Sequence, residues 1–443
     1  MSTKYATEPT VLVGVLTAPT INIVLDGTYI ADGREVTGPQ TVTLDADNRP
    51  LWNGRSYDIL HFKAADTGNT FEIKDVVIGV NFHWERKEDQ RFKGNVSFRY
   101  EKGLVAINEL SVEDYLSSVI SSEMSANASL ELLKAHAVIS RSWLLAQIEK
   151  NKKIEAAGTK YSAYTETADE RIKWYDREDH VHFHVCADDH CQRYQGITRQ
   201  TTPKVAEAVA ATRGEVLTSE GELCDARFSK CCGGVFEEFE NCWEPRHFSY
   251  LVARRDSTAP TDFPDLRKED EASKWIESRP DAFCNTSDAS ILSQVLNNYD
   301  QETRDFYRWS VTYTREEISK LVAERSGIDF GEIIDLIPVE RGTSGRLVRL
   351  KFVGTKRTMT IGKELEIRRT LSPSHLYSSA FTIQRHDIDP ATGLPGSFTL
   401  SGAGWGHGVG LCQIGAAVMG AKGYDYRKIL AHYFPGADLS SLY

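Results

Sequence analysis

The sequence predicts an α+β protein with a mixed core, in which two adjacent helices carry the site, an N-terminal β region and an inserted helix and strand module. Three observations predict this fold. Residues 10–103 bunch or alternate β-branched residues between Gly, Asp and Asn. Apolar residues recur at helical spacing from Glu109 onward. A later, more charged stretch, residues 255–368, has the pattern of solvated helices and a strand pair.

Length and charge restrict the function. A chain of 443 residues suggests about three domains, or one large core with an insertion. The formal net charge of −11 argues against a general nucleic-acid binder, which needs a basic face. No apolar run approaches the roughly 18 residues of a membrane span. The first twenty residues lack the features of a secretion signal, so we expect a cytoplasmic chain or one whose signal has been removed.

These patterns divide the chain into four expected parts. Residues 1–103 form a β region that packs or binds, because residue types that carry chemistry are sparse there. Residues 104–254 are the first half of a core, and residues 369–443 are its second half. Residues 255–368 are a module inserted between the two halves, with a wet, charged surface.

Two helices are expected at the start of the core. Ser111, followed by three residues that include Glu113 and Asp114, predicts a capped helix with an acidic first turn that runs to about Met124. A second, longer helix begins near Leu130 and is apolar around most of its circumference. Such a helix belongs inside a domain.

Two cations interrupt that second apolar helix. Lys134 and Arg141 are two turns apart and therefore share one face. A charge inside an apolar helix needs a partner or a cleft. Each side chain therefore either reaches the surface or pairs with a structural acid, or the shared face lines a functional site.

Histidine and cysteine gather in the segment HVHFHVCADDHC, residues 180–191. We expect its first histidines, His180, His182 and His184, to point to one face of a strand. Two Cys and two His within twelve residues suit tetrahedral zinc, and the three histidines compete for one ligand place. Four protein ligands would make such a zinc structural. The alternative is two free cysteines and surface histidines.

Glycine marks two further segments. Cys232-Gly233-Gly234 predicts a tight turn where backbone can approach a ligand, and redox chemistry at the preceding Cys231–Cys232 pair is disfavoured because adjacent cysteines rarely bridge without strain. In residues 401–416, many glycines surround Trp405 and His407. The segment lacks the ending of a phosphate-binding loop. An indole and an imidazole on such a loop suit a sugar ring and its hydroxyls.

Four sequence blocks occur in the order LSVEDYLSSVISSEM, LELLKAHAVISRSWLL, CADDHCQRYQG and GWGHGVGLCQIGA. These blocks resemble those of the SpoIID/LytB domain family, and the resemblance covers about residues 105–440. They are similar to the family's P-x-E-D-Y-L-x-G-V-x-x-S-E-M, LKAQAVAARTYAL, C-x-x-x-x-C-Q-x-Y-x-G and GWGHGVGMSQYGA. The chain departs from these patterns at His136, Ser142 and Cys412, where the family has Gln, Thr and Ser.

The resemblance implies activity on peptidoglycan, by lytic transglycosylases that cut glycan strands stripped of stem peptides. The catalytic acid of the S-E-M block corresponds to Glu123, and the Lys and Arg of the next block correspond to Lys134 and Arg141. The zinc ligands implied by position are His180, Cys186, His190 and Cys191. Peptidoglycan as substrate also implies the cell envelope as the place of action. A second possibility is a non-catalytic glycan binder that enhances a cell-wall amidase.

A single carboxyl group suffices for the transglycosylase reaction. Glu123 would donate a proton to the leaving oxygen, and the 6-hydroxyl of the muramic acid would attack in place of water. Burial should raise the pKa of this acid so that it starts protonated. Because close cations would lower that pKa, we expect Lys134 and Arg141 to lie several ångströms from the Glu123 oxygens, binding substrate or holding other acids. A zinc-dependent hydrolase is the third possibility.

Overall fold

A computed structural model describes residues 5–78, 86–125, 128–157, 162–175, 180–188, 191–199, 202–258, 262–295 and 305–443. The chain forms two compact units. The first comprises Met1–Lys153, Arg177–Asp225 and Asp438–Tyr443, and the second comprises Ile154–Asp176 and Ala226–Ala437. Residues 226–254 and 369–437 thus group with residues 255–368. The four-part division stays a prediction about sequence modules, which need not coincide with compact units.

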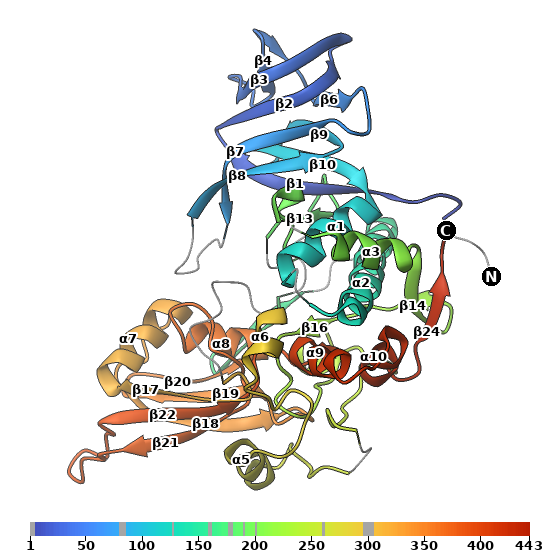
Figure 1. The fold of residues 1–443 in the computed structure, drawn as a ribbon. Coiled ribbons are helices and arrows are strands. Elements are labelled where there is room, and N and C mark those ends of the chain that lie inside the picture. The colour runs from blue at the N-terminus through green and yellow to red at the C-terminus, as the bar shows by residue number, and fades with distance from the viewer. Residues whose placement is uncertain are drawn as a thin grey trace. The chain divides into compact units, whose positions relative to one another are not determined.

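The first unit is built on a large β sheet, as residues 10–103 predicted (Figure 1). The order of its strands is β13-β1-β10-β9-β6-β2-β3-β4-β5, and β7 pairs with β2 and β8. The strands are β1 (Thr10–Ala18), β2 (Thr20–Ala31), β3 (Arg34–Leu44), β4 (Pro50–Trp52), β5 (Arg55–Ser56), β6 (Leu60–Ala64), β7 (Thr70–Ile78), β8 (Arg86–Lys93), β9 (Asn95–Tyr100), β10 (Leu104–Ser111) and β13 (Val185–Cys186).

Two helices follow β10 directly. In α1 (Val112–Glu123) the Ser111 hydroxyl accepts a hydrogen bond from the Asp114 N–H at 3.2 Å, which confirms the predicted cap. The helix α2 (Leu130–Ala157) begins at the predicted residue. Helix α1 contacts β1 and β10 on one side and α3 (Pro203–Ala211) on another. The two predicted helices are therefore present, and α1 packs against strands of the sheet.

Short elements complete the first unit. The 3-10 helix η1 (Gly196–Arg199) packs on β8, and a small sheet has the order β15-β14-β24. Its strands are β14 (Glu215–Ser219), β15 (Glu222–Leu223) and β24 (Asp438–Ser441). The C-terminal strand β24 thereby returns to a unit whose other residues precede it by more than two hundred positions.

The second unit contains three small sheets with the orders β11-β12-β20-β19-β18, β17-β22-β21 and β16-β23. Their strands are β11 (Tyr164–Glu166), β12 (Glu170–Lys173), β16 (Phe228–Ser229), β17 (Arg308–Thr314), β18 (Ile333–Arg341), β19 (Leu347–Gly354), β20 (Thr358–Gly362), β21 (Phe381–His386), β22 (Ser397–Ala403) and β23 (Leu411–Cys412). The helices are α4 (Phe239–Cys242), α5 (Glu269–Glu277), α6 (Ala289–Val295), α7 (Arg315–Ser326), α8 (Glu364–Thr370), α9 (Gln413–Ala421) and α10 (Tyr426–Tyr433).

The main core of the second unit lies between α7, α8 and the strands (Figure 1). Its fully buried members include Ile318 and Val322 from α7, Phe352 from β19, Ile367 from α8 and Leu400 from β22. The helices and the strand pair predicted in residues 255–368 are present, but α7 is only partly solvated, because it buries Ile318 and Val322. The whole chain is α+β, as predicted. Among the helices that the structure describes, none is long and apolar enough to cross a membrane.

Candidate active site and metal clusters

Glu123 is the last residue of α1, and its side chain is partly exposed. The carboxylate is oriented by backbone, because the Arg193 N–H donates to Oε1 at 3.0 Å. The helix ends at the next residue, since Met124 has extended dihedral angles. The acid thus sits at a fixed point where the chain leaves α1.

Residues 192–194 hold α1 through three different contacts. The Tyr115 hydroxyl donates to Gln192 Oε1 at 3.1 Å, and the ring of Tyr194 stacks on that of Tyr115 with centroids 5.3 Å apart. The Arg193 N–H supplies the third contact, to Glu123. Because Tyr115 and Glu123 lie eight residues apart on α1, the segment fixes both the middle and the end of the helix. We call residues 192–194 the clamp segment.

Of the alternatives for Arg141, the structure shows the pairing with a structural acid. Its side chain is completely buried, and its guanidinium donates to both carboxylate oxygens of Glu113, at 2.9 and 2.6 Å. A third bond, to the Glu215 carbonyl, is 2.8 Å long. Arg141 therefore holds the first turn of α1 against α2 and β14, and its charge is balanced inside the unit.

Lys134 is more accessible than Arg141. Its side chain is partly exposed, and its ammonium lies 2.8 Å from the Glu131 carboxylate one turn earlier on α2. On the buried side of the same helix, His136 Nδ1 lies 3.2 Å from the Ser140 hydroxyl, and the Ser140 carbonyl accepts from Gln192. This polar chain links α2 to the clamp segment.

Three side chains of the predicted zinc segment come together. The ligand atoms of His180, Cys186 and Cys191 all lie within 4.8 Å of one another, and His180 Nε2 is 3.6 Å from Cys191 Sγ. The parallel pairing of Cys186 with Gly14 of β1 places the group beside the large sheet. A side chain at Gly14 would overlap the Phe183 ring, so this glycine permits the close approach.

The expected strand through the histidines is wrong. Strand β13 begins only at Val185, and residues 181–184 are bends. The three histidines therefore do not share a strand face. The ring of His184 turns toward β1, where Nδ1 accepts from the Leu12 N–H at 3.1 Å, and His180 alone of the described histidines joins the cysteines. His190 lies outside the described residues.

In the second unit, residues 401–416 contain the glycine-rich loop. Its path depends on backbone conformations that glycine allows, as the composition predicted. Gly404, Gly406, Gly408 and Gly410 all have positive φ, a region that side chains rarely adopt. The loop encloses the buried guanidinium of Arg346, which donates to the carbonyls of residues 232 and 406 at 3.1 Å each. A side chain at residue 408 would overlap that guanidinium, so the glycines make room for an arginine of their own unit.

Trp405 and His407 are both partly exposed. The indole of Trp405 packs against the rings of Phe306 and Tyr377, with centroids 4.8 and 4.7 Å away. The His407 ring lies 4.9 Å from the Trp243 ring, and its Nδ1 accepts from the Val409 N–H. Burial, followed by the positive charges of nearby arginines, holds the pKa of His407 well below its ordinary value. The imidazole is therefore neutral.

Gly233 and Gly234 pack against protein. A Cβ at Gly233 would lie 3.1 Å from the backbone at Ala403, and one at Gly234 would meet the Tyr307 hydroxyl. Both glycines are buried and have positive φ. The predicted tight turn is therefore present, and the chain that it brings close is the segment leading into the glycine-rich loop.

Sequence reasoning missed a second group of potential ligands. Cys232, Asp256, Cys284 and Cys412 are all buried, and their ligand atoms lie within 4.8 Å of one another. Burial raises the pKa of the Cys412 thiol, but hydrogen bonds from the neighbouring thiols outweigh burial and leave this pKa well below its usual value. The four residues are widely separated along the chain, so no short sequence motif indicates the group.

Comparison with known proteins identifies the region around Glu123. Residues 100–219 match the family described as stage II sporulation protein, SpoIID. The chain carries a SpoIID domain. Residues 237–410 match a domain of unknown function, DUF8618. The SpoIID domain contains Glu123, the clamp segment, Arg141 and the His180 cluster, which consists of His180, Cys186 and Cys191. The match covers three of the four sequence blocks that indicated the resemblance, whereas the fourth, at residues 404–416, lies outside it.

Named relatives are distant. An uncharacterized protein of Brachyspira hyodysenteriae is 26% identical over 77% of this chain and 69% of its own length. The amidase enhancer of Bacillus subtilis is 24% identical over 74% of this chain, and the match covers only 40% of that protein. Stage II sporulation protein D of the same organism is 22% identical over 77% of this chain and 78% of its own length. The chain is thus a distant relative of an amidase enhancer and of a stage II sporulation protein D.

Replacing Arg141 with Met should destabilise the SpoIID domain by about 3 to 5 kcal/mol, because Glu113 would lose the partner of a buried ion pair. Urea unfolding followed by circular dichroism measures the change. Arg213→Met is the matched control, since Arg213 pairs with Glu8 at the surface and should contribute less than about 1 kcal/mol. Equal effects of the two substitutions would contradict the structural role of Arg141.

The second unit should become less stable as the pH decreases below about 6.5, which is the ordinary pKa of a histidine. His407 stays neutral in the folded unit and takes up a proton on unfolding, so its contribution is present above that pH and is lost as the pH falls. Thermal unfolding between pH 7 and pH 5 measures the slope. His407→Gln should reduce the slope by at most about 1.4 kcal/mol per pH unit. His386→Gln in the same unit is the control, and an unchanged slope in His407→Gln would refute the assignment.

Proposed function

We propose that this protein cleaves peptidoglycan glycan strands as a lytic transglycosylase, with Glu123 as the general acid and base. The observation that carries the proposal is the partly exposed carboxylate at the end of α1, oriented by the Arg193 N–H inside the SpoIID domain. Strands without stem peptides are the proposed substrate, and the cell envelope is the proposed place of action.

The reaction needs one carboxyl group in two protonation states. Glu123 first gives its proton to the glycosidic oxygen, and the bond to the anomeric carbon breaks through an oxocarbenium-like state. The carboxylate then accepts the proton of the muramic 6-hydroxyl, whose oxygen attacks the anomeric carbon and closes the anhydro ring. The acid is restored and no water is consumed.

The surroundings of Glu123 suit an acid that changes charge. The negative end of the α1 dipole lies at this residue and disfavours an anion there. The Arg193 N–H favours the anion, because it donates to Oε1. These opposing influences support a carboxyl group that can hold a proton and also release it.

Other side chains take supporting roles in this proposal. On α2, the partly exposed side chain of Lys134 is the proposed contact for oxygen atoms of the substrate. Arg141 acts as a positioning residue, since it reaches α1 through Glu113. In the second unit, Trp405 and His407 remain proposed glycan contacts, because both residues are partly exposed.

We also propose that His180, Cys186 and Cys191 bind a zinc ion. Two thiolates and an imidazole within 4.8 Å of one another match the preferences of zinc, so the described residues fit the metal. His190 is the predicted fourth ligand. The ion would cross-link the side chains that bind it and so hold their backbone segments together. Because Cys191 immediately precedes the clamp segment, the fixed cysteine would stabilise the backbone that orients Glu123.

A non-catalytic enhancer of a cell-wall amidase is the second candidate function. The distant relative named amidase enhancer favours it, because it matches most of this chain. In that case the glycan contacts would remain while bond cleavage would not occur. An assay for anhydromuramyl products separates the two functions.

Glu123→Gln should reduce the release of anhydromuramyl products from peptide-free glycan by at least a hundredfold, because the amide keeps the shape and lacks the proton. Mass spectrometry of the products measures the rate, on strands with and without stem peptides. Glu109→Gln, which changes a partly exposed acid of the same unit, is the matched control. Anhydromuramyl release by Glu123→Gln at the normal rate would show that the acid is misassigned.

Binding of glycan by wild-type protein with no anhydromuramyl product would instead support the enhancer. Stimulation of a purified cell-wall amidase by both wild type and Glu123→Gln would then be expected.

Cys186→Ser should lose one zinc ion per chain and lower the melting temperature of the SpoIID domain, because the cluster links β13 to the clamp segment. Elemental analysis and thermal unfolding measure the two effects. A chelator that abolishes turnover and leaves thermal stability unchanged would favour a zinc-dependent hydrolase over a structural zinc.

A further inference from the structure

We propose that Cys232, Asp256, Cys284 and Cys412 form a second, structural zinc site, within the second unit. All four side chains are buried, with exposed fractions of 2%, 0%, 1% and 0%. The proposal does not rest on the function of Glu123, because the residues belong to the other unit and no step of the reaction uses them.

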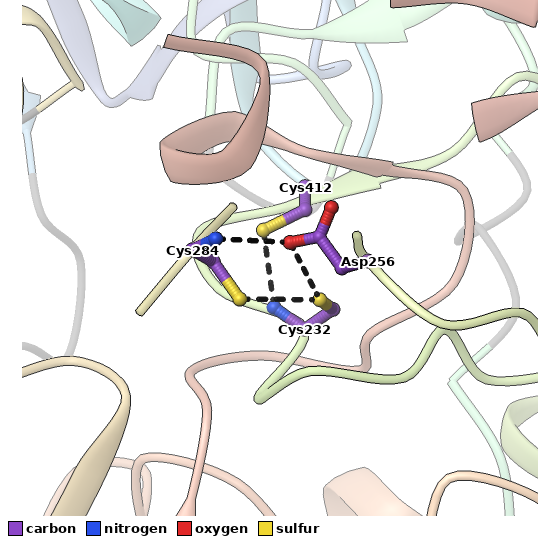
Figure 2. A group of neighbouring side chains, drawn as sticks. All are labelled: Cys232, Asp256, Cys284 and Cys412. Carbon is purple, nitrogen blue, oxygen red and sulfur yellow. Dashed lines mark hydrogen bonds between the residues drawn. The ribbon is translucent and has the colours of Figure 1, made fainter. Parts of the chain in front are cut away.

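The distances fit four ligands around one small cation (Figure 2). The sulfur atoms of Cys232 and Cys284 are 3.5 Å apart, and Cys232 Sγ lies 3.5 Å from Asp256 Oδ2. Zinc–sulfur bonds of about 2.3 Å place two sulfurs of a tetrahedron about 3.8 Å apart. The observed distance between the Cys232 and Cys284 sulfurs is therefore only about 0.3 Å shorter than that around a bound ion.

The ligand types select the metal. Three thiolates and one carboxylate suit a tetrahedral, borderline-soft cation, whereas magnesium and calcium prefer six or more oxygen ligands. With four protein ligands and no exposed member, the site offers no open position for substrate. The ion would therefore have a structural role.

Outer contacts orient the carboxylate toward the sulfurs. Asp256 Oδ1 accepts from the Tyr433 hydroxyl at 3.0 Å and lies 3.3 Å from His432 Nε2. Its other oxygen, Oδ2, faces the cysteines and accepts from the Cys284 N–H at 3.1 Å. Such second contacts are typical of metal-binding side chains, whose free atom they hold in place.

Backbone N–H groups also point at the sulfurs. The Cys232 N–H donates to Cys412 Sγ at 3.2 Å, and the Gly234 N–H donates to Cys232 Sγ at 3.4 Å. Donors of this kind stabilise negative charge on sulfur, which a metal-bound thiolate carries. Buried thiols with no metal would gain little from them.

The site would join four distant segments of the second unit. Cys232 follows β16, and Asp256 and Cys284 lie in loops. Cys412 is the last residue of β23 and the residue immediately before α9. Strands β16 and β23 pair directly, so two ligands come from neighbouring strand ends. The ion would fix the loops that carry the other two.

Zinc content per chain tests the proposal. With the His180 cluster also occupied, wild-type protein purified with zinc should contain two ions per chain by elemental analysis. Cys284→Ser should lose one of them and show a lower melting temperature. Cys242→Ser is the matched control, since Cys242 is a buried cysteine of the same unit outside the group, and it should keep both ions. Unchanged zinc content in Cys284→Ser would overturn the proposal.

Anomalous diffraction at the zinc edge, from wild-type crystals, keeps the test independent of variants that fail to fold. A peak bonded to the three sulfurs and to Asp256 Oδ2 is the expected result. No peak there, or a covalent bond between Cys232 and Cys284, would overturn the proposal. The Cys186→Ser variant should lose only the other ion, so loss of the His180 site is distinguishable from failure here.

Discussion

The stacking of Tyr194 on Tyr115 is the contact on which the candidate site depends. It presses the clamp segment against the middle of α1, and the same three residues place a backbone N–H on the carboxylate of Glu123. Both tyrosine rings are buried, so water does not compete for the stacked faces. The position of a partly exposed acid is thereby determined by a buried aromatic pair.

Buried guanidinium groups organise each unit in the same physical way. Arg141 joins α2 to the first turn of α1, and Arg346 gathers carbonyls from the glycine-rich loop and from the turn after β16. In both cases a buried positive charge is surrounded by acceptors from its own unit. Chemistry is better sought at side chains that remain partly exposed, such as those of Glu123 and Lys134.

Local sequence patterns predicted the helices and loops, but they could not predict contacts between residues that are far apart in the sequence. The cap at Ser111, the helix from Leu130 and the backbone-shaped loop follow from residues close together in the sequence. The histidine strand failed because alternation alone predicted it, while His184 turns to bond β1. The partner of Arg141 could not be predicted either, since Glu113 lies 28 residues earlier and became its neighbour only through the packing of two helices.

The second metal group shows the same limit more strongly. Cys232 is separated from Asp256 by 24 residues, from Cys284 by 52 and from Cys412 by 180. Spacing rules detect ligands that share a turn or a strand, and none of these four residues does. The sequence pointed to Cys232 in a tight turn and to Cys412 in a glycine-rich block, and only the fold brings these two residues together with Asp256 and Cys284.

The enclosed guanidinium of Arg346 has a consequence for how the second unit assembles. Two of its acceptors, the carbonyls of residues 232 and 406, lie 114 and 60 residues away along the chain, and another, the Ser344 hydroxyl, lies 2 residues away. Contacts of such long range are costly to form early, because the intervening chain must first be ordered. A chain that ends before the glycine-rich loop would therefore lack the residue 406 carbonyl, and the guanidinium would reach its full set of acceptors only after that loop has been added.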